Sequence, residues 1–304
     1  MRPIPQARFH ELVRAVCDGS YEGTEDAVTY GPLEDWDTSE IHDMHRAFYY
    51  QATFDRDLSR WNTSRVTDMS GMFCHAEVFN TSIGAWDVGR VTNMSGMFLS
   101  AFAFNQPLDG WDVGQVTNME SMFLGAHAFN APIGRWNVSR VTDMRGMFFD
   151  THDFNQPLDG WDVGQVTNME SMFANTHAFN APIGRWNVSR VTDMWLMFFN
   201  TRAFDQPLGR WNVSRVQSFR YMFARARAFN QSLERWDVSS ATDMRQMFTD
   251  ARAFHQPLAR WNVSRTTSKQ DMFTHVPVFG RPPWRLQEEE EEEEEKEDNP
   301  ARAN

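Results

Sequence analysis

The sequence predicts an α/β solenoid made of ten turns that are each 25 residues long. The main observation is the spacing of tryptophan, which recurs without insertion or deletion at positions 36, 61, 86, 111, 136, 161, 186, 211, 236 and 261. A fixed period of this size is typical of solenoids, in which each turn buries its apolar face only by stacking on its neighbours. Because nearly every column repeats, the chain lacks the unique constellation of residues that catalysis needs, and we expect no enzyme.

A short strand is predicted around the tryptophan of each turn. Leu108, Trp111, Val113 and Val116 have the spacing of the strand half of a leucine-rich repeat. Trp111 and Val113 flank a polar residue, which is the alternation of a strand with one buried face. The solenoid is therefore expected to be leucine-rich-repeat-like, with the strands of successive turns stacked in parallel.

A short helix is predicted after each strand. The apolar residues between Val116 and Ala126 are spaced like one face of a helix. Thr117 and Glu120 have the spacing of a capping box at the start of that helix. A loop with Pro132 closes the turn, because proline cannot continue a helix.

Two stretches recur unchanged two turns further along the chain. Phe104–Phe123 is identical to Phe154–Phe173, and His127–Met144 is identical to His177–Met194. The array therefore grows by copying pairs of turns.

The repeat resembles a known family. The string Phe104-Asn-Gln-Pro-Leu-x-x-Trp-Asp-Val-x-x-Val-Thr-Asn-Met-x-x-Met-Phe is similar to the BspA-type leucine-rich repeats, whose units read WDVSxVTDMxxMFxxAxxFNQ. The resemblance covers roughly residues 30–280. It implies protein binding or adhesion and brings no conserved catalytic residue. Such repeats occur in bacterial surface proteins, in algae and in large DNA viruses.

Both ends of the chain depart from the repeat, as the capping of a solenoid requires. An amphipathic helix that contains Phe9, Leu12, Val13 and Val16 can cover the first turn. The predicted domains are a helical cap at residues 1–29, a ten-repeat solenoid at 30–279, a C-terminal cap at 280–287 and an acidic disordered tail at 288–304.

The negative charge is concentrated in the tail. The formal net charge is −12, and residues 288–304 hold ten acidic and two basic side chains, which leaves −4 for residues 1–287. Because this body is nearly balanced, we expect no nucleic acid binding. The eight consecutive glutamates at 288–295 repel one another and are expected to be disordered, as either a solubilising or an interaction tail.

The sequence also bears on location. No stretch approaches the length of a membrane span, and residues 1–5 do not open a signal peptide. Cys17 and Cys74 lie in unlike contexts, so we expect no disulfide framework and a reducing compartment. We therefore expect an intracellular or virion-associated protein.

Arginine forms two columns beside the predicted strands. One column precedes the tryptophan: Arg60, Arg135, Arg185, Arg210, Arg235 and Arg260. The other lies four residues after it: Arg65, Arg90, Arg140, Arg190, Arg215 and Arg265. Two interpretations stay open, which are pairing with acidic residues of the chain itself and binding of an acidic protein or glycan. The candidate binding residues are Arg135, Arg140, Arg185, Arg190, Arg210 and Arg215.

Large apolar residues break the pattern at one place. Trp195 and Leu196 stand where other turns carry small or polar residues, and Tyr221 follows in the column of Leu196. These three residues are a candidate contact patch. Local packing between neighbouring helices is the competing interpretation.

Other repeated polar residues have simpler interpretations. Asp or Asn follows every repeat tryptophan, and a ladder of hydrogen bonds is a simpler account of this column than calcium binding, because the calcium-roll pattern is absent. His127, His152 and His177 share a column, but one histidine per turn does not predict a metal cluster. We expect no metal site and no cofactor.

The sequence therefore predicts a non-catalytic scaffold that mediates protein–protein interaction through an unknown partner. The alternative is a structural or adhesive protein that binds a repetitive polymer or glycan, or that self-assembles.

Overall fold

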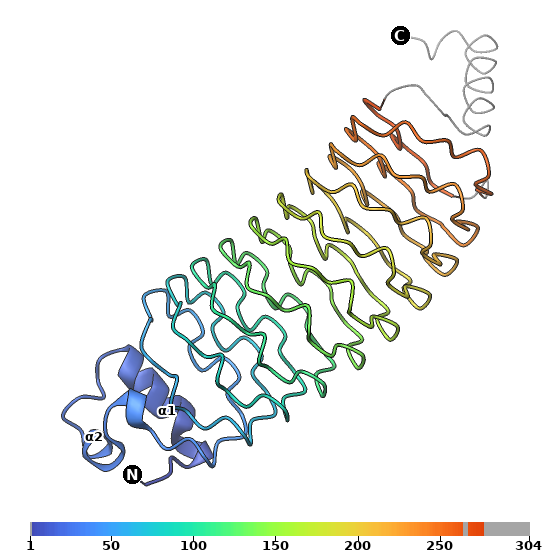
Figure 1. Ribbon diagram of the computed structural model, residues 1–304. Coiled ribbons are helices and arrows are strands. Elements are labelled where there is room, and N and C mark those ends of the chain that lie inside the picture. Colours follow the sequence, from blue (N-terminus) through green and yellow to red (C-terminus); the bar gives the residue numbers. More distant parts are fainter. Residues whose placement is uncertain (1, 264–266, 277–304) are drawn as a thin grey trace.

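The computed structural model describes residues 2–263 and 267–276. Figure 1 shows an elongated solenoid of stacked turns with two short helices at its N-terminal end. Within the described residues, the helical elements are α1 (Gln6–Cys17), α2 (Glu25–Tyr30) and the 3-10 helix η1 (Leu33–Asp35). The prediction of a repeat solenoid with 25-residue turns is confirmed.

Successive turns are joined in parallel at the same position of each repeat. Isolated parallel bridges run from the pair Asp43 and Asp68 to the pair Asp243 and Ser268 at the other end. The bridged residue follows the threonine of the motif Thr-Asn-Met or its equivalent, so it lies several residues beyond the tryptophan. We call residues 92–102 and the equivalent residues of other turns the ladder face.

The ladder face is held together by backbone hydrogen bonds from alternate residues. The amide of Met94 donates to the carbonyl oxygen of Asn118 on the next turn at 3.0 Å, and the amide of Phe98 donates to Met122 at 2.9 Å. An intervening amide bonds within its own turn, because that of Met97 donates to the carbonyl of Met94 at 3.2 Å. The amides of this stretch therefore alternate between joining neighbouring turns and shaping a single turn.

The predicted helix between Val116 and Ala126 is wrong. Two residues in this stretch have left-handed backbones, Ser121 with φ 54° and Gly125 with φ 69°. An α-helix needs an unbroken run of right-handed residues, and a left-handed residue every four positions prevents one. The amide of Glu120 bonds to the side chain of Asn118 at 2.9 Å instead of taking part in a capping box.

The predicted strand at Trp111 and Val113 is also wrong, because these residues form no bridge to a neighbouring turn. The contact between turns is made there by side chains. Trp111 stacks on Trp136 with ring centroids 6.3 Å apart and an interplanar angle of 5°. Its indole Nε1 donates to the carbonyl oxygen of Ile83 on the preceding turn at 3.2 Å. We call residues 108–116 and their equivalents the tryptophan face.

Phenylalanine columns fill the space between the two faces. Phe123 stacks on Phe129 of its own turn at 3.8 Å and on Phe148 of the next turn at 5.8 Å. All three side chains are fully buried. The aromatic core is therefore continuous along the solenoid, and no turn has a core of its own.

The N-terminal helix α1 covers the first turn. Phe9, Leu12 and Val13 are its buried residues, and the ring of Phe9 lies edge-on to Trp61 at 5.7 Å. The hydrophobic face predicted for this segment therefore packs on the end of the aromatic core. The predicted C-terminal cap at 280–287 and acidic tail at 288–304 lie outside the described residues.

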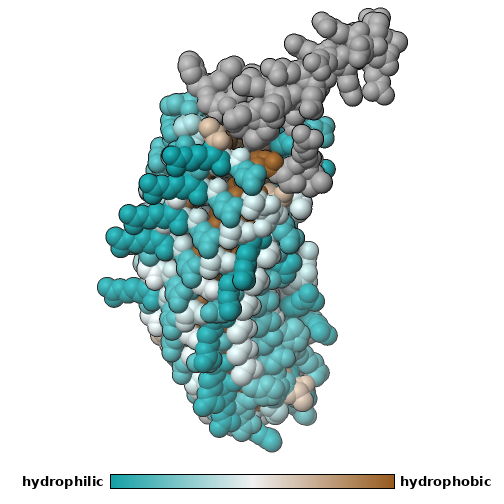
Figure 2. Space-filling view, turned by 90° about the vertical axis from the view of Figure 1, so that its right-hand side faces the viewer, coloured by the Kyte–Doolittle hydropathy of each residue, from teal (hydrophilic) through white to brown (hydrophobic). Residues whose placement is uncertain are grey.

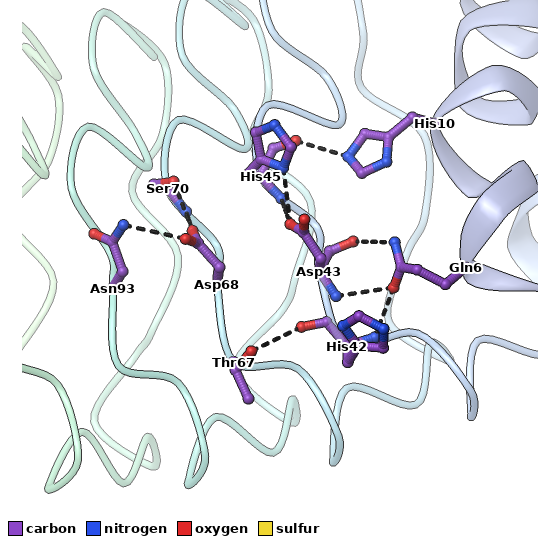
Figure 3. A network of polar contacts seen from close by, with 9 residues as sticks. All are labelled: Gln6, His10, His42, Asp43, His45, Thr67, Asp68, Ser70 and Asn93. Atoms are coloured by element: carbon purple, nitrogen blue, oxygen red, sulfur yellow. Dashed lines mark hydrogen bonds and ion pairs between the residues drawn. The ribbon is translucent and has the colours of Figure 1, made fainter.

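Gln6 of α1 closes the open edge of the ladder, as Figure 3 shows. Its side-chain oxygen accepts from the backbone amides of His42 and Asp43 at 2.9 and 3.0 Å. Its side-chain nitrogen donates to the carbonyl oxygen of Asp43 at 2.9 Å. Thr67 is the equivalent of His42 on the next turn, and its backbone amide donates to the carbonyl oxygen of His42 on the preceding turn. The side-chain amide thus substitutes for a missing turn and protects the edge.

Replacing a central tryptophan should strongly destabilise the solenoid. Trp136 is 3% exposed and stacks on both neighbouring tryptophans. Trp136→Ala should lower the free energy of unfolding by about 3–5 kcal/mol, because it leaves a cavity and removes two ring contacts. Chemical denaturation measures this loss. The adjacent exposed residue provides the control, since Arg135→Ala should change stability by less than about 0.5 kcal/mol, and similar losses for both variants would contradict the role of the stack.

Removing the side-chain amide of Gln6 should weaken the N-terminal end. Gln6→Leu keeps the approximate shape but removes three hydrogen bonds to the first turn, so stability should fall by about 1–3 kcal/mol. Thermal or chemical unfolding of the full chain measures the change. Glu11→Ala on the same helix is the control, because that side chain is largely exposed and its ion pair contributes little. Equal stability of Gln6→Leu and the native chain would show that the edge needs no cap.

Candidate functional site

A groove on the tryptophan face contains part of the arginine column that precedes the tryptophans. Its volume is about 830 Å³, and its lining includes Arg185, Arg210 and Arg235 together with the carboxylates of Asp159 and Glu234. The remaining lining comes from proline, glycine, glutamine and serine residues between positions 182 and 232. The site is thus a groove that is open to solvent and lined by charged side chains together with proline and glycine.

A second cavity continues this groove toward the C-terminal end. It has a volume of about 470 Å³ and is lined in part by Glu234, Arg235 and Arg260. Because both cavities share Glu234 and Arg235, four consecutive turns contribute an arginine to one continuous surface. We call this surface, with Arg185, Arg210, Arg235 and Arg260, the arginine groove.

The tryptophan stack fixes the repeat distance in the arginine groove. The indole centroids of Trp186, Trp211, Trp236 and Trp261 follow one another at 6.4, 6.4 and 6.5 Å. Each arginine of the groove immediately precedes one of these residues in the chain. The backbone positions that carry the arginines therefore repeat with nearly the same step.

Ion pairing separates the arginines of this column into two groups. Arg60 pairs with Asp35 at 2.6 Å, and Arg260 pairs with Glu234 at 3.3 Å. Arg135, Arg185, Arg210 and Arg235 are exposed, and none of them forms an ion pair with any residue that the structure describes. The guanidinium groups of the groove that remain available to a ligand therefore belong to Arg185, Arg210 and Arg235.

The arginines that follow the tryptophans behave differently. Arg140 donates to the side chain of Gln115 on the preceding turn at 2.5 Å, and Arg190 donates in the same way to Gln165. Arg215 is exposed and has no ion pair with a described residue. Arg265 lies outside the described residues. This column thus makes contacts between turns at two of its positions and does not line the groove.

The Asp or Asn after each tryptophan shapes its own turn. In the turn of Trp236, the side chain of Asp237 accepts a hydrogen bond from the backbone amide of Ser239 at 3.1 Å. Hydrogen bonds from the hydroxyl and the amide of Ser239 hold the pKa of Asp237 below its ordinary value. These residues form Asx turns, which agrees with the structural interpretation of this column.

The structure places Trp195, Leu196 and Tyr221 on the ladder face, away from the arginine groove. All three are half-buried, and Leu196 and Tyr221 occupy left-handed positions with φ 57° and 56°. Tyr221 lies edge-on to Phe199 at 6.3 Å. The large hydrophobic residues that are exposed in the described chain lie elsewhere, at Val28, Tyr49, Tyr50 and Val78. Partner binding by Trp195, Leu196 and Tyr221 stays a prediction.

The face of the molecule in Figure 2 is mainly hydrophilic, in agreement with the few exposed large hydrophobic residues. On the face shown, hydrophilic side chains form rows along the solenoid, with little hydrophobic area between them. Recognition on such a surface depends on charge and hydrogen bonding more than on apolar burial.

The two cysteines are free thiols in the structure. Burial raises the pKa of the Cys17 thiol to about 11 and also raises the pKa of Cys74. Both are therefore protonated at neutral pH and poorly nucleophilic.

Sequence reasoning missed a cluster in the histidine column of the ladder face. Asp150 on one turn contacts His152 of the same turn and His127 of the preceding turn. Burial lowers the pKa of the next histidine, His177, and the positive charge of Arg202 adds to this effect. The available signal was that Asp150 lies two residues before His152, a combination that the turns of His127 and His177 lack.

Comparison with known proteins assigns the chain to a family. A family model described as "Mycoplasma protein of unknown function, DUF285" matches residues 17–130, 103–198 and 181–283. The chain belongs to this family. The three matches overlap and together cover most of the solenoid. No curated protein matches the sequence.

Solved structures show a weaker likeness to this DUF285 protein. A leucine-rich repeat protein from Eubacterium ventriosum ATCC 27560 has 10% identity and a TM-score of 0.30, over 81% of this chain and 83% of that one. A leucine rich cell surface protein from Faecalibacterium prausnitzii A2-165 has 12% identity and a TM-score of 0.30, over 75% and 79%. In the described residues, no helix is long and apolar enough to cross a membrane.

The glycines beside the arginine groove should be indispensable for the close approach of neighbouring turns. A Cβ atom at Gly184 would lie 2.3 Å from the carbonyl oxygen of Pro207, whereas at Gly160 the nearest atom would be 3.5 Å away. Gly184→Ala should therefore cost about 1–3 kcal/mol of stability through overpacking. Gly160→Ala is the matched control and should be nearly neutral. Denaturation of both variants decides, and a neutral Gly184→Ala would mean that the turns separate freely at this groove.

Proposed function

We propose that the chain is a non-catalytic repeat scaffold that binds an extended acidic segment of a partner protein in the arginine groove. The observation that carries this proposal is the run of exposed arginines at Arg185, Arg210 and Arg235, which form no ion pair with a described residue. Membership of a repeat family, with no catalytic family matched, supports a scaffold rather than an enzyme.

The charge of the arginine groove favours an acidic partner. Arginine is always protonated and presents a planar fork of donors that matches a carboxylate. One of the two carboxylates in the lining, Glu234, is already paired with Arg260. The groove therefore offers more positive than negative hydrogen-bonding groups to a ligand.

The spacing of the groove favours an extended peptide. Side chains on one face of an extended strand repeat every second residue, at roughly 6.4–6.8 Å. The turns repeat at 6.4–6.5 Å in this part of the tryptophan face. An acidic side chain at every second position of a partner would thus meet one arginine on each successive turn, without loss of register.

The rigidity of the scaffold adds to this match. The backbone under the arginine groove is fixed by buried tryptophans and by the ladder on the opposite side of each turn. A partner therefore orders few scaffold residues when it binds, which reduces the entropic cost of association.

A pair of synthetic peptides tests this function on the full chain. A labelled peptide of six Glu-Thr repeats should bind more tightly than a peptide of three Glu-Glu-Thr-Thr repeats, which has the same composition. In the second peptide the glutamates on either face of an extended strand are four residues apart, so they meet only every second arginine. The triple variant Arg185→Ala, Arg210→Ala and Arg235→Ala should weaken binding of the first peptide by at least about tenfold. Fluorescence anisotropy at low and high salt measures the affinities. Binding should disappear near 1 M salt, where the Debye length is about 3 Å.

A control variant with the same change in charge separates site binding from general attraction. Arg202→Ala, Arg227→Ala and Arg252→Ala also remove three exposed arginines, which lie outside the arginine groove. This triple variant should retain most of the affinity. Equal losses in both triple variants, or equal binding of both peptides, would contradict a register-specific groove.

A further inference from the structure

Two adjacent turns of the ladder face bring together two histidines and a carboxylate. The Nε2 atom of His127 lies 3.3 Å from Oδ2 of Asp150, and the Nε2 atom of His152 lies 3.0 Å from Oδ1 of the same carboxylate. The potential ligand atoms of the three residues all lie within 4.8 Å of one another. The three side chains are half-buried.

These separations approach those of a tetrahedral metal site. With metal–ligand bonds of about 2.0–2.1 Å, two ligands of a tetrahedral zinc ion lie roughly 3.3 Å apart. Both histidine–carboxylate distances are already close to this value. The two imidazoles are stacked in the structure, so each ring must turn toward the carboxylate before both nitrogens can bind one ion.

Neighbouring rings hold the two imidazoles in place. His127 and His152 stack at 4.6 Å with an interplanar angle of 4°. Phe102 stacks on the outer side of His127 at 4.8 Å, and His177 stacks on the outer side of His152 at 4.9 Å. The step between turns that orders the core thus keeps the two imidazoles next to each other, and binding of one ion by both requires them to tilt out of this stack.

We propose that His127, Asp150 and His152 form a binding site for a divalent transition-metal ion of the zinc type. Two imidazole nitrogens and one carboxylate suit Zn²⁺ and its neighbours in the first transition row, whereas Ca²⁺ and Mg²⁺ prefer oxygen ligands. Three protein ligands leave a fourth position for water or for a side chain of another molecule. The bound ion would link two successive turns of the solenoid. This site is independent of the arginine groove.

Among the residues that the structure describes, two histidines meet a carboxylate at one place in this column. The position of Asp150 is occupied by Asn175 and Asn200 on the following turns. His177 Nε2 lies 3.2 Å from the side-chain nitrogen of Asn200. An amide nitrogen does not ligate a metal ion, so the third histidine of the column lacks the carboxylate that completes the site.

A second group near the N-terminus is less suitable. His10, Asp43 and His45 also lie within reach of one another. However, Figure 3 shows that the Nε2 atom of His10 points at the backbone carbonyl of His45, with a distance of 2.8 Å. A metal ion at that nitrogen would remove the proton from a bond to a carbonyl oxygen that is not one of the three ligands. At His127 and His152 the nitrogen contacts the Asp150 carboxylate, which would itself bind the ion. Asp43 also accepts from the backbone amide of His45 at 2.9 Å.

Zinc titration of the full chain tests the proposal. Isothermal titration calorimetry should detect one Zn²⁺ per chain. Asp150→Asn should weaken binding by at least about tenfold, because even the outer partners of metal ligands cost 10–100-fold when removed. Co²⁺ provides a second readout, since a tetrahedral site produces intense visible absorption that Asp150→Asn should abolish. Zn²⁺ should also raise the unfolding temperature of the native chain more than that of the variant.

The repeat supplies substitutions that the fold already accepts. His152→Arg introduces the residue that the same column carries at Arg202, and His127→Phe introduces the residue found at Phe102. Both should weaken Zn²⁺ binding as Asp150→Asn does. His255→Asn is the control, because it replaces an exposed histidine of another column with the residue found at Asn230, and it should leave the affinity within about threefold.

Two results would overturn the proposal. One is the absence of Zn²⁺ binding to the folded native chain. The other is equal Zn²⁺ affinity in the native chain and in Asp150→Asn, which would mean adventitious binding to surface histidines. Asp150→Asn is nearly isosteric, so it decides the matter even if a histidine variant does not fold.

Discussion

The structure depends on the hydrogen bonds that alternate residues of the ladder face donate to the next turn. Each of these bonds satisfies an amide that a helix would have bonded within its own segment. The alternation requires left-handed backbone at positions such as Ser121 and Ser100, which costs free energy in an isolated turn. A single turn is therefore unstable, and its backbone is satisfied only when another turn lies on each side.

The aromatic columns provide the free energy that this backbone lacks. The repeat tryptophans and the phenylalanines in the columns of Phe123 and Phe129 are almost fully buried through most of the array, and burial of each removes a large apolar area from water. The rings also define the distance between turns on the side opposite the ladder. The same packing that stabilises the chain thus sets the spacing of every surface group, including the arginines of the groove and the histidines of the proposed metal site.

The sequence was sufficient to predict the solenoid, because a strict period of 25 residues leaves few other architectures. It was misleading about local structure. The apolar spacing between Val116 and Ala126 is that of a helix, yet the left-handed positions that prevent one are filled by serine, leucine and tyrosine as well as by glycine. No residue type marks them, because packing against neighbouring turns imposes the conformation.

The candidate sites were predictable to different degrees. Arg185 and Arg210 were recognised from their column, but the sequence left open whether they pair with carboxylates of the chain itself, and only the structure shows that neither pairs with a described residue. The contact of Asp150 with His127 joins residues on different turns and different columns. It could be found only with the register of the ladder, which the expected strand and helix placed wrongly.

The identical stretches of the chain show where its turns have diverged since they were copied. His127–Met144 and His177–Met194 are the same, and they include the tryptophan face. The residues that follow differ: Arg145 and Gly146 correspond to Trp195 and Leu196, and Asp150 corresponds to Asn200. All of these changes lie on the ladder face, where the backbone is fixed by bonds between turns and by the unchanged side chains of Asp143 and Asp193. Duplication thus gives the protein one face that is copied faithfully and another on which individual turns can acquire separate chemistry.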